Sequence, residues 1–179
     1  MDAIVEAALR KWPNVPHVLG WLGLDARGHW WLRDAVAQAA GPFPASRGSR
    51  IEHPALIAFI GRNYAADAHG AWYFQNGPQR VYVDLEAAPW IWRLQPEAGG
   101  VAIASHTGTA ATLRSTWLDE AGRLFVDTDL GFGLVHSLDT ELAARALEAS
   151  AWPAPQEVPF DAMPARFGYR LRARRDSAG

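Results

Sequence analysis

The sequence predicts an α+β fold built from two small halves, each an antiparallel β meander with a helix. Three observations support this prediction. Short apolar or alternating segments bounded by Gly, Pro, Asn and Asp recur along the chain, as they do in hairpin strands. Apolar residues recur at helical spacing in 2–11, 53–67 and 139–149. Three turns share the form Asp-x-x-Gly, at Asp25–Gly28, Asp67–Gly70 and Asp119–Gly122.

The first half is expected at 1–95 and begins with a helix over 2–11. Asp2 can cap this helix, and Pro13 prevents it from continuing. A hairpin around the Asp25 turn follows. Residues 40–49 are rich in Gly, Pro and Ser and are expected to form a linker.

A second helix is expected in 53–67, with Pro54 at its first position. Two strands in 71–86 then complete the first half. Residues 87–94 are expected to turn away from the sheet, and the Gly- and Pro-containing stretch 95–100 to mark the boundary.

The second half is expected at 101–179. Three strands joined by tight turns are predicted in 112–138, followed by a helix in 139–149. A last strand is predicted in 165–176, where Arg170, Arg172 and Arg174 alternate with apolar residues. Charges on an edge strand discourage aggregation, and we favour this reading over phosphate binding.

The Asp-x-x-Gly turns raise the question of an internal duplication. The turns at Asp67 and Asp119 are each followed by strand, turn and strand, but the three turns are unevenly spaced and the sequence identities are few. A diverged duplication and convergent hairpin chemistry both account for this pattern.

The hairpin in 71–86 is predicted to contain the most distinctive surface. Pro78 lacks the amide hydrogen that a two-residue Asn76-Gly77 loop would need, so we expect a four-residue loop, 76–79. This loop places Gln75 opposite Arg80. Because side chains alternate along a strand, an apolar core face is separated from a polar face. The polar face holds Tyr73, Gln75, Arg80, Tyr82 and Asp84.

A polar sheet face has two interpretations. It is either a solvated surface with cross-strand pairs or a binding surface for a small ligand or a protein. The second interpretation adds three neighbouring residues as candidate ligand-binding groups: Arg62, Asn63 and Asn76.

The sequence contains few motifs for catalysis or for metal and cofactor binding. The chain has no cysteine, no phosphate-binding loop, no nucleophile elbow and no zinc-protease motif, and its six histidines lack metal-ligand spacing. We therefore expect no metal and no cofactor. His17 is the most interesting histidine, although a structural role is favoured over catalysis. The nine tryptophans are expected mainly to pack the core.

Charge and hydropathy limit the partners. The formal net charge is −2, so nucleic acid is not an expected partner. No segment reaches the length of a membrane-spanning helix, and the first residues, MDAIVEAALRKWP, lack the apolar core of a signal peptide. A cytoplasmic protein is expected.

Three blocks carry a resemblance to a known family: KWPNVPHVLGWLGLDARGHWWLRD, HPALIAFIGRNYAADAHGAWYFQNGPQRVYVDLEAAPWIWRL and MPARFGYRL. With these blocks, nearly the whole chain resembles an uncharacterised proteobacterial family of about this length. It is more distantly similar to a second uncharacterised bacterial family of α+β proteins. Both resemblances imply a small cytoplasmic α+β protein, and neither assigns a role to any residue.

We predict a non-catalytic binding or regulatory module that uses the polar hairpin face for a small molecule or a protein. An enzyme acting on a small polar substrate, with His17 or a carboxylate as base, is the alternative from a different class. A homo-oligomeric structural protein is a third, for which an apolar patch around Trp90 and Trp92 would be the interface.

Overall fold

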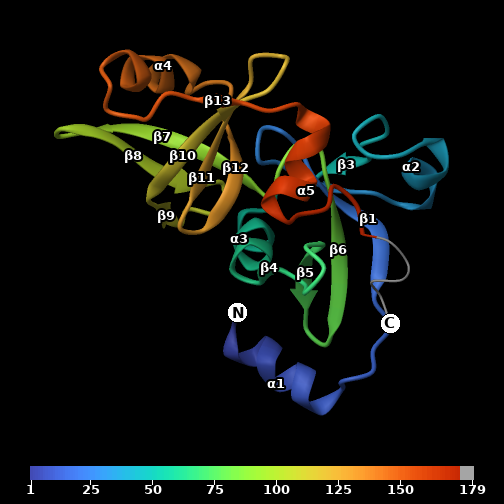
Figure 1. Cartoon of the computed structure of the whole chain (residues 1–179). Helices are drawn as coiled ribbons and strands as arrows, with labels where there is room; N and C mark the ends of the chain where they lie inside the picture. Colours follow the sequence, from blue (N-terminus) through green and yellow to red (C-terminus); the bar gives the residue numbers. More distant parts are fainter. Residues whose placement is uncertain (174–179) are drawn as a thin grey trace. The chain divides into compact units, whose positions relative to one another are not determined.

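The structure, a computed structural model, describes residues 1–173 and has mixed helices and strands in two compact units (Figure 1). Unit 1 comprises residues 1–25, 29–86 and 168–173, and unit 2 comprises 26–28 and 87–167. Each unit contains its own β-sheet. The α+β class and the division into two halves are therefore confirmed.

Unit 1 contains a six-stranded sheet in the order β3-β2-β1-β6-β5-β4. Its central strands, β1 and β6, are parallel, and the remaining neighbours are antiparallel. The sheet is thus two three-stranded antiparallel meanders, β1-β2-β3 and β4-β5-β6, joined through the parallel pair β1 and β6. The strands are β1 (Val18–Leu24), β2 (Trp30–Leu32), β3 (Ser49–Arg50), β4 (Tyr64–Ala66), β5 (Trp72–Asn76) and β6 (Gln79–Leu85).

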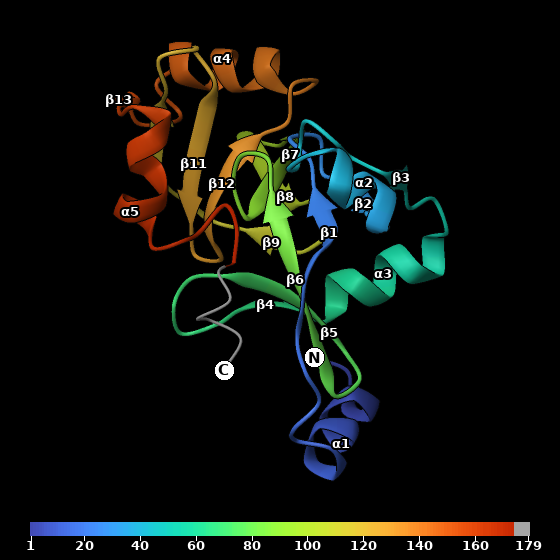
Figure 2. The ribbon, with the colours of Figure 1, turned by 90° about the vertical axis from the view of Figure 1, so that its right-hand side faces the viewer.

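Three helices belong to unit 1: α1 (Ala3–Lys11), α2 (Ala35–Ala40) and α3 (Pro54–Arg62). Helix α3 lies along one side of the sheet (Figure 2), where Phe59 meets Phe74 of β5 edge to face. On the other side, the fully buried ring of Phe43 packs on Gly23, where an added Cβ would lie 2.6 Å from the ring. Both faces are covered toward the ends of the two central strands, where Leu22, Leu24, Val83 and Leu85 are buried.

Unit 2 contains a seven-stranded sheet in the order β13-β10-β11-β12-β7-β8-β9. Trp92 is completely buried in its core and donates its indole N–H to the Val126 carbonyl at 3.0 Å. The elements are β7 (Trp90–Glu97), β8 (Gly100–Ser105), β9 (Ala110–Ala111), β10 (Leu113–Leu118), β11 (Leu124–Thr128), β12 (Gly131–Val135), α4 (Thr140–Glu148), β13 (Gln156–Glu157), the 3-10 helix η1 (Phe160–Ala162) and α5 (Met163–Phe167).

The two sheets share one connectivity. Read from β9 to β10, unit 2 has the order β9-β8-β7-β12-β11-β10, which is the order of unit 1 with every strand number raised by six. The parallel pair, β1 with β6 or β7 with β12, is central in both. The turns that begin at Asp67 and Asp119 occupy the same place, between β4 and β5 and between β10 and β11. A diverged duplication and convergence towards the same order both account for this arrangement.

The Asp-x-x-Gly turns have the predicted geometry. In each, the Asp side chain accepts the backbone N–H of the residue four positions later, at 2.8–2.9 Å. The glycine has a φ of +73° to +78°, which an L side chain rarely adopts. Ser105 replaces the Asp in a fourth turn, where its hydroxyl accepts the Thr109 N–H at 3.2 Å.

Several predicted elements were wrong. The second helix ends at Arg62, because Tyr64–Ala66 pairs with β5 as β4. Residues 40–49 are not a simple linker, since α2 ends at Ala40 and Phe43 enters the core of unit 1.

The region after the hairpin also differs from the prediction. Residues 87–94 do not turn away, since Trp90–Glu97 is the long strand β7, and 95–100 contains the turn into β8. The predicted C-terminal strand is replaced by α5 and one isolated bridge between Ala71 and Arg170. Arg174 lies outside the described residues.

No helix within residues 1–173 is long and apolar enough to cross a membrane.

Candidate functional site

The predicted hairpin has the expected register but a shorter loop. Gln75 pairs with Arg80, as predicted, and Asn76 also pairs with Gln79, so the loop contains only Gly77 and Pro78. The four-residue loop was wrong because Gly77 adopts a φ of +56°, which a two-residue hairpin requires at its first position. Pro78 then sits where no ladder hydrogen bond is needed.

The polar face of the hairpin is largely covered by other parts of unit 1. Tyr73, Gln75 and Tyr82 are buried, and the two tyrosines pack with Leu19 and Ala173. Gln75 donates its side-chain amide to the Gly77 carbonyl at 2.9 Å. Tyr73 and Tyr82 therefore belong to a small second core, and Gln75 is buried with its amide bound to the hairpin loop.

Arg80 and His17 lie close to these tyrosines. The Arg80 guanidinium lies over the Tyr73 ring, 4.5 Å from its centroid, and His17 meets Tyr82 edge to face. Burial and the positive charge of Arg80 lower the pKa of His17. Burial, as the largest cause, raises the pKa of Tyr82, whose hydroxyl binds Asp67 at 3.1 Å.

Arg62 and Asn63 bind the start of the chain. The Arg62 guanidinium contacts the Asp2 carboxylate at 3.1 Å, and the Asn63 amide oxygen accepts the Asp2 backbone N–H at 2.8 Å. The hydrogen bond from Arg62 is the main cause that lowers the pKa of Asp2. Asp2 therefore marks the start of α1, as predicted, but its side chain anchors the helix to α3 and does not cap it.

Asp84 faces Arg33 on the same side of the sheet as the tyrosines. Burial raises the pKa of Asp84, while the positive charges of Arg33 and Arg172 oppose this rise. The Arg33 guanidinium lies 3.4 Å from the Asp84 carboxylate. The structure thus divides the eight predicted ligand-binding residues among several environments, and only Asn76 borders a pocket described below.

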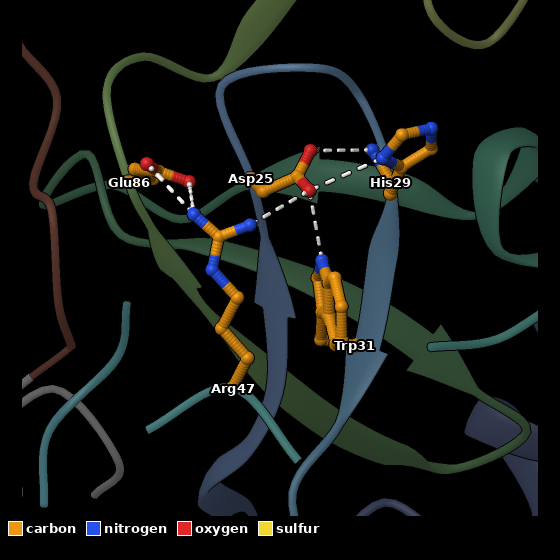
Figure 3. Close-up of polar contacts among 5 residues, drawn as sticks. All are labelled: Asp25, His29, Trp31, Arg47 and Glu86. Carbon is orange, nitrogen blue, oxygen red and sulfur yellow. Dashed lines mark hydrogen bonds and ion pairs between the residues drawn. The ribbon is translucent and has the colours of Figure 1, made fainter. Parts of the chain in front are cut away.

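A charged cluster forms where β1 and β6 end (Figure 3). Asp25 and Glu86 directly follow these parallel strands, and Arg47 bridges them, at 3.4 Å from Asp25 and 3.0 Å from Glu86. The Asp25 carboxylate also accepts the Trp31 indole N–H at 2.9 Å and contacts the His29 ring at 3.2 Å.

The geometry of this cluster favours a structural role. Asp25 has a side-chain exposure of only 2%, and its partners come from β2, the turn before it and the loop around residue 47. Charged groups that are buried need such partners, because an unpaired buried charge is costly. The cluster therefore links the end of β1, the end of β6 and the loop around residue 47. Asp25 and Glu86 lie close together because β1 and β6 are parallel neighbours. The sequence alone would have predicted this only if it had also predicted the parallel pairing.

An apolar pocket lies on the α3 side of the unit 1 sheet. Its volume is about 360 Å³, within the lower range of small-molecule sites. The lining comes from β1, β2, β5, β6, α3 and Ile51, and consists of Val18, Trp21, Leu22, Leu32, Ile51, Leu56, Ile60, Phe74, Asn76, Gln79 and Val81. Three of these large apolar side chains remain substantially exposed: Trp21 (44%), Leu32 (50%) and Leu56 (41%).

A β-bulge brings Trp21 to this pocket. Val18 pairs with Val81 and Leu22 with Val83, so four steps along β1 match two steps along β6. In a regular strand Trp21 would face away from Val18 and Leu22, but all three line the pocket. Bulges often re-aim a side chain near a functional site. The irregularity in β1 therefore contributes an aromatic wall that regular alternation would not supply.

Gly20 and Arg33 hold the bulge in place. Gly20 has a φ of +77°, and its carbonyl accepts a hydrogen bond from the Arg33 guanidinium at 3.2 Å. The Arg33 backbone N–H donates to the Trp21 carbonyl at 2.9 Å. Arg33 is 3% exposed and also binds the carbonyls of Ala37, Gly41 and Ser46. The pocket wall thus depends on a buried arginine on the opposite side of the sheet.

We expect Gly20→Ala to lower the free energy of unfolding by about 1–2 kcal/mol, since an L residue is disfavoured at positive φ. The added Cβ would also lie 3.1 Å from the Gln38 side-chain oxygen. Urea unfolding measures the effect. Gly100→Ala is the control, because Gly100 has no positive φ and nothing lies within 4 Å of its added Cβ. Equal stability of wild type and Gly20→Ala would show that the bulge is not held in this conformation.

Comparison with known proteins places the chain in a family. A family model described as "Protein of unknown function (DUF2946)" matches residues 1–174. The chain belongs to this family. The predicted resemblance to such a family over nearly the whole chain is thereby confirmed. A comparison with curated proteins gives no match.

Two solved structures are similar to this chain. One is a DUF1285 family protein from Silicibacter pomeroyi DSS-3, with a TM-score of 0.50 and 14% identity over 83% of this chain and 84% of that chain. The other is a DUF1285 family protein from Shewanella baltica OS155, with a TM-score of 0.48 and 14% identity over 73% of this chain and 92% of that chain. The first similarity concerns the fold alone and agrees with the second family resemblance seen in the sequence.

Proposed function

We propose that unit 1 of this DUF2946 family member is a non-catalytic binding module that takes a small, mainly apolar ligand in the pocket beside α3. One observation carries the proposal: Trp21, Leu32 and Leu56 are exposed, and all three line the same concave apolar surface. Exposed apolar side chains that stand alone need no explanation, but a contiguous hollow set points to binding. The predicted site residue Asn76 belongs to this pocket.

Burial of the pocket lining would drive the binding. Each Å² of apolar surface removed from water stabilises a complex by roughly 25 cal/mol before the costs of association are subtracted. A ligand that fills the pocket covers both its own apolar surface and that of the three exposed side chains. The proposal places this module in the cytoplasm, the compartment that the sequence predicts.

The charged cluster around Asp25 supports this non-catalytic reading over the enzyme alternative. Arg47 binds two carboxylates, and Asp25 accepts hydrogen bonds from groups on three sides. These contacts pair the opposite charges with each other and stabilise the fold around them. In the proposal the cluster is therefore a structural part of unit 1, and the pocket beside α3 is the binding site.

A charge placed in the pocket tests the proposal. Leu56 lies in the first turn of α3, where a carboxylate interacts favourably with the helix dipole, so Leu56→Asp should fold. We expect this change to weaken binding of the uncharged apolar dye phenylnaphthylamine by about tenfold or more, because the carboxylate must lose water when the dye binds. Dye fluorescence in a titration gives the affinity.

Val36→Asp is the matched control. Val36 is 77% exposed, lies in the first turn of α2 and does not line the pocket. This variant should bind the dye like the wild type. Absence of saturable dye binding to the wild type, or equal weakening by both variants, would contradict the proposed function.

A further inference from the structure

We infer that the ligand of this pocket is an uncharged amphiphile: a chain or ring system of about ten carbon atoms in length with one hydrogen-bonding group at the hairpin end. This inference rests on the proposed function and adds the chemical class of the ligand. Three features of the pocket support it: the chemistry of the lining, the position of its polar groups and the length of its floor.

The lining contains no ionisable side chain. Nine of the eleven lining residues are apolar, and the other two, Asn76 and Gln79, carry neutral amides. A carboxylate or an ammonium group would lose water on entering and would find no opposite charge there. Three arginines on or beside the sheet do not compensate: Arg80 lies over Tyr73, Arg33 binds Asp84, and Arg50 of β3 does not line the pocket. A neutral ligand avoids this cost.

The two amides lie together at one end. Asn76 and Gln79 are paired across the last rung of the β5–β6 hairpin. Gln79 donates its amide N–H to the Pro16 carbonyl at 2.9 Å, which leaves its amide oxygen as an acceptor. Within residues 1–173 no hydrogen bond to the Asn76 side chain is formed by another residue, so its amide can both donate and accept. A hydroxyl or an amide on the ligand matches this pair.

The floor of the pocket runs from these amides along the strands. Phe74 pairs with Val81, Val81 with Val18, and Leu22 lies opposite both Val83 and Leu32. From Gln79 to the level of Val83 the floor extends roughly 13 Å, at about 3.3 Å per residue. An extended chain of about ten carbons spans this length, because bonds of about 1.5 Å advance somewhat less than that in a zigzag. Its apolar end would meet Trp21, Leu22 and Leu32.

Competition titrations test this inference. Decanol, decanoate and decylamine share one chain length and differ only in the charge of the polar group, and each is used below its aggregation concentration to displace bound phenylnaphthylamine. We expect decanol to bind at least tenfold more tightly than either charged compound. The variant Asn76→Leu should weaken decanol several-fold, on the order expected for one hydrogen bond. Val36→Asp, which lies outside the pocket, should bind decanol like the wild type.

The outcomes separate the two proposals. If the dye binds, and decanoate or decylamine binds as tightly as decanol or more tightly, the inference of an uncharged ligand is overturned. The proposed apolar pocket would still stand. Dye binding that none of the three compounds displaces would also overturn the inference of an uncharged ligand. Failure of the dye itself to bind the wild type would overturn the proposed function. An unchanged decanol affinity in Asn76→Leu would contradict the placement of the polar group at the hairpin.

Discussion

Replacement of Arg33 by methionine should lower the free energy of unfolding by about 3–5 kcal/mol, the cost expected when one partner of a buried charged network is removed. Arg33 donates to four carbonyl oxygens, those of Gly20, Ala37, Gly41 and Ser46, and to the Asp84 carboxylate. Methionine fills a similar volume but donates to none of these acceptors, and among residues 1–173 only the Ala37 carbonyl keeps a second side-chain donor, the Ser46 hydroxyl. Burial already raises the pKa of Asp84, and loss of the cation would raise it further.

The Arg33 prediction is measured by urea unfolding at neutral pH, with Arg50→Met as the control. Arg50 lies on β3 of the same sheet and is exposed, so its replacement should change stability by no more than about 0.5 kcal/mol. Arg33→Lys should recover only part of the loss, because an ammonium group cannot reproduce the planar fork of a guanidinium. A wild-type stability in Arg33→Met would mean that the bulge is held by other contacts.

Replacement of Asp25 by alanine should cost about 2–4 kcal/mol. The change removes the acceptor for the His29 backbone N–H and for the Trp31 indole, and it removes one of the two carboxylates that bind Arg47. The Trp31 indole N–H would lose its partner, and such a loss costs more than the net gain from making the bond.

Asp67→Ala separates the turn from the charged cluster. Asp67 occupies the same type of turn and accepts the Ala71 N–H and the Tyr82 hydroxyl, but among residues 1–173 it has no ion-pair partner that joins strand ends. We expect this variant to lose about 1–2 kcal/mol. The difference between the two variants, measured by urea unfolding, reports the contribution of the Asp25 cluster. Equal losses would assign the whole effect to the turns.

Local patterns in the sequence predicted much of the fold. The Asp-x-x-Gly turns, the hairpin β1–β2, the pairing of Gln75 with Arg80 and the helices near Pro54 and Asp139 all depend on residues close together in the chain. A few neighbouring residues determine a turn or a helix start, so these elements could be predicted from the sequence.

The pairing of strands that are far apart in the chain could not be predicted in the same way. The parallel contact of β1 with β6 joins residues about sixty positions apart, and nothing in either segment specifies the other as its partner. The strand Trp90–Glu97 was missed because it contains Pro96 and is followed by glycines, which are typical of a loop, although residues 92–97 alternate between apolar and polar side chains. The burial of Tyr73 and Tyr82 depends on residues 168–173 returning to unit 1, which composition does not reveal.

The candidate pocket was predictable only at one residue. Asn76 was predicted as a ligand-binding neighbour of the polar hairpin face, and it lines the pocket. Phe74 and Val81 lie on the apolar face of the hairpin, which was predicted to face the core, and Gln79 was predicted to lie in the loop. The useful signal was Gly20 inside an apolar strand, because a glycine in such a place often marks a bulge. Its effect on the direction of Trp21 required the structure.

The most direct test of the pocket is a nuclear magnetic resonance titration of the indole N–H signals with phenylnaphthylamine. The chain has nine tryptophans, and the signal of Trp21 can be assigned by its absence in Trp21→Phe. We predict a saturable shift of the Trp21 signal, while the signals of Trp92 and Trp152, which are buried in the core of unit 2, remain in place. An unchanged Trp21 signal at saturating dye, or equal shifts at all three tryptophans, would contradict a ligand site beside α3.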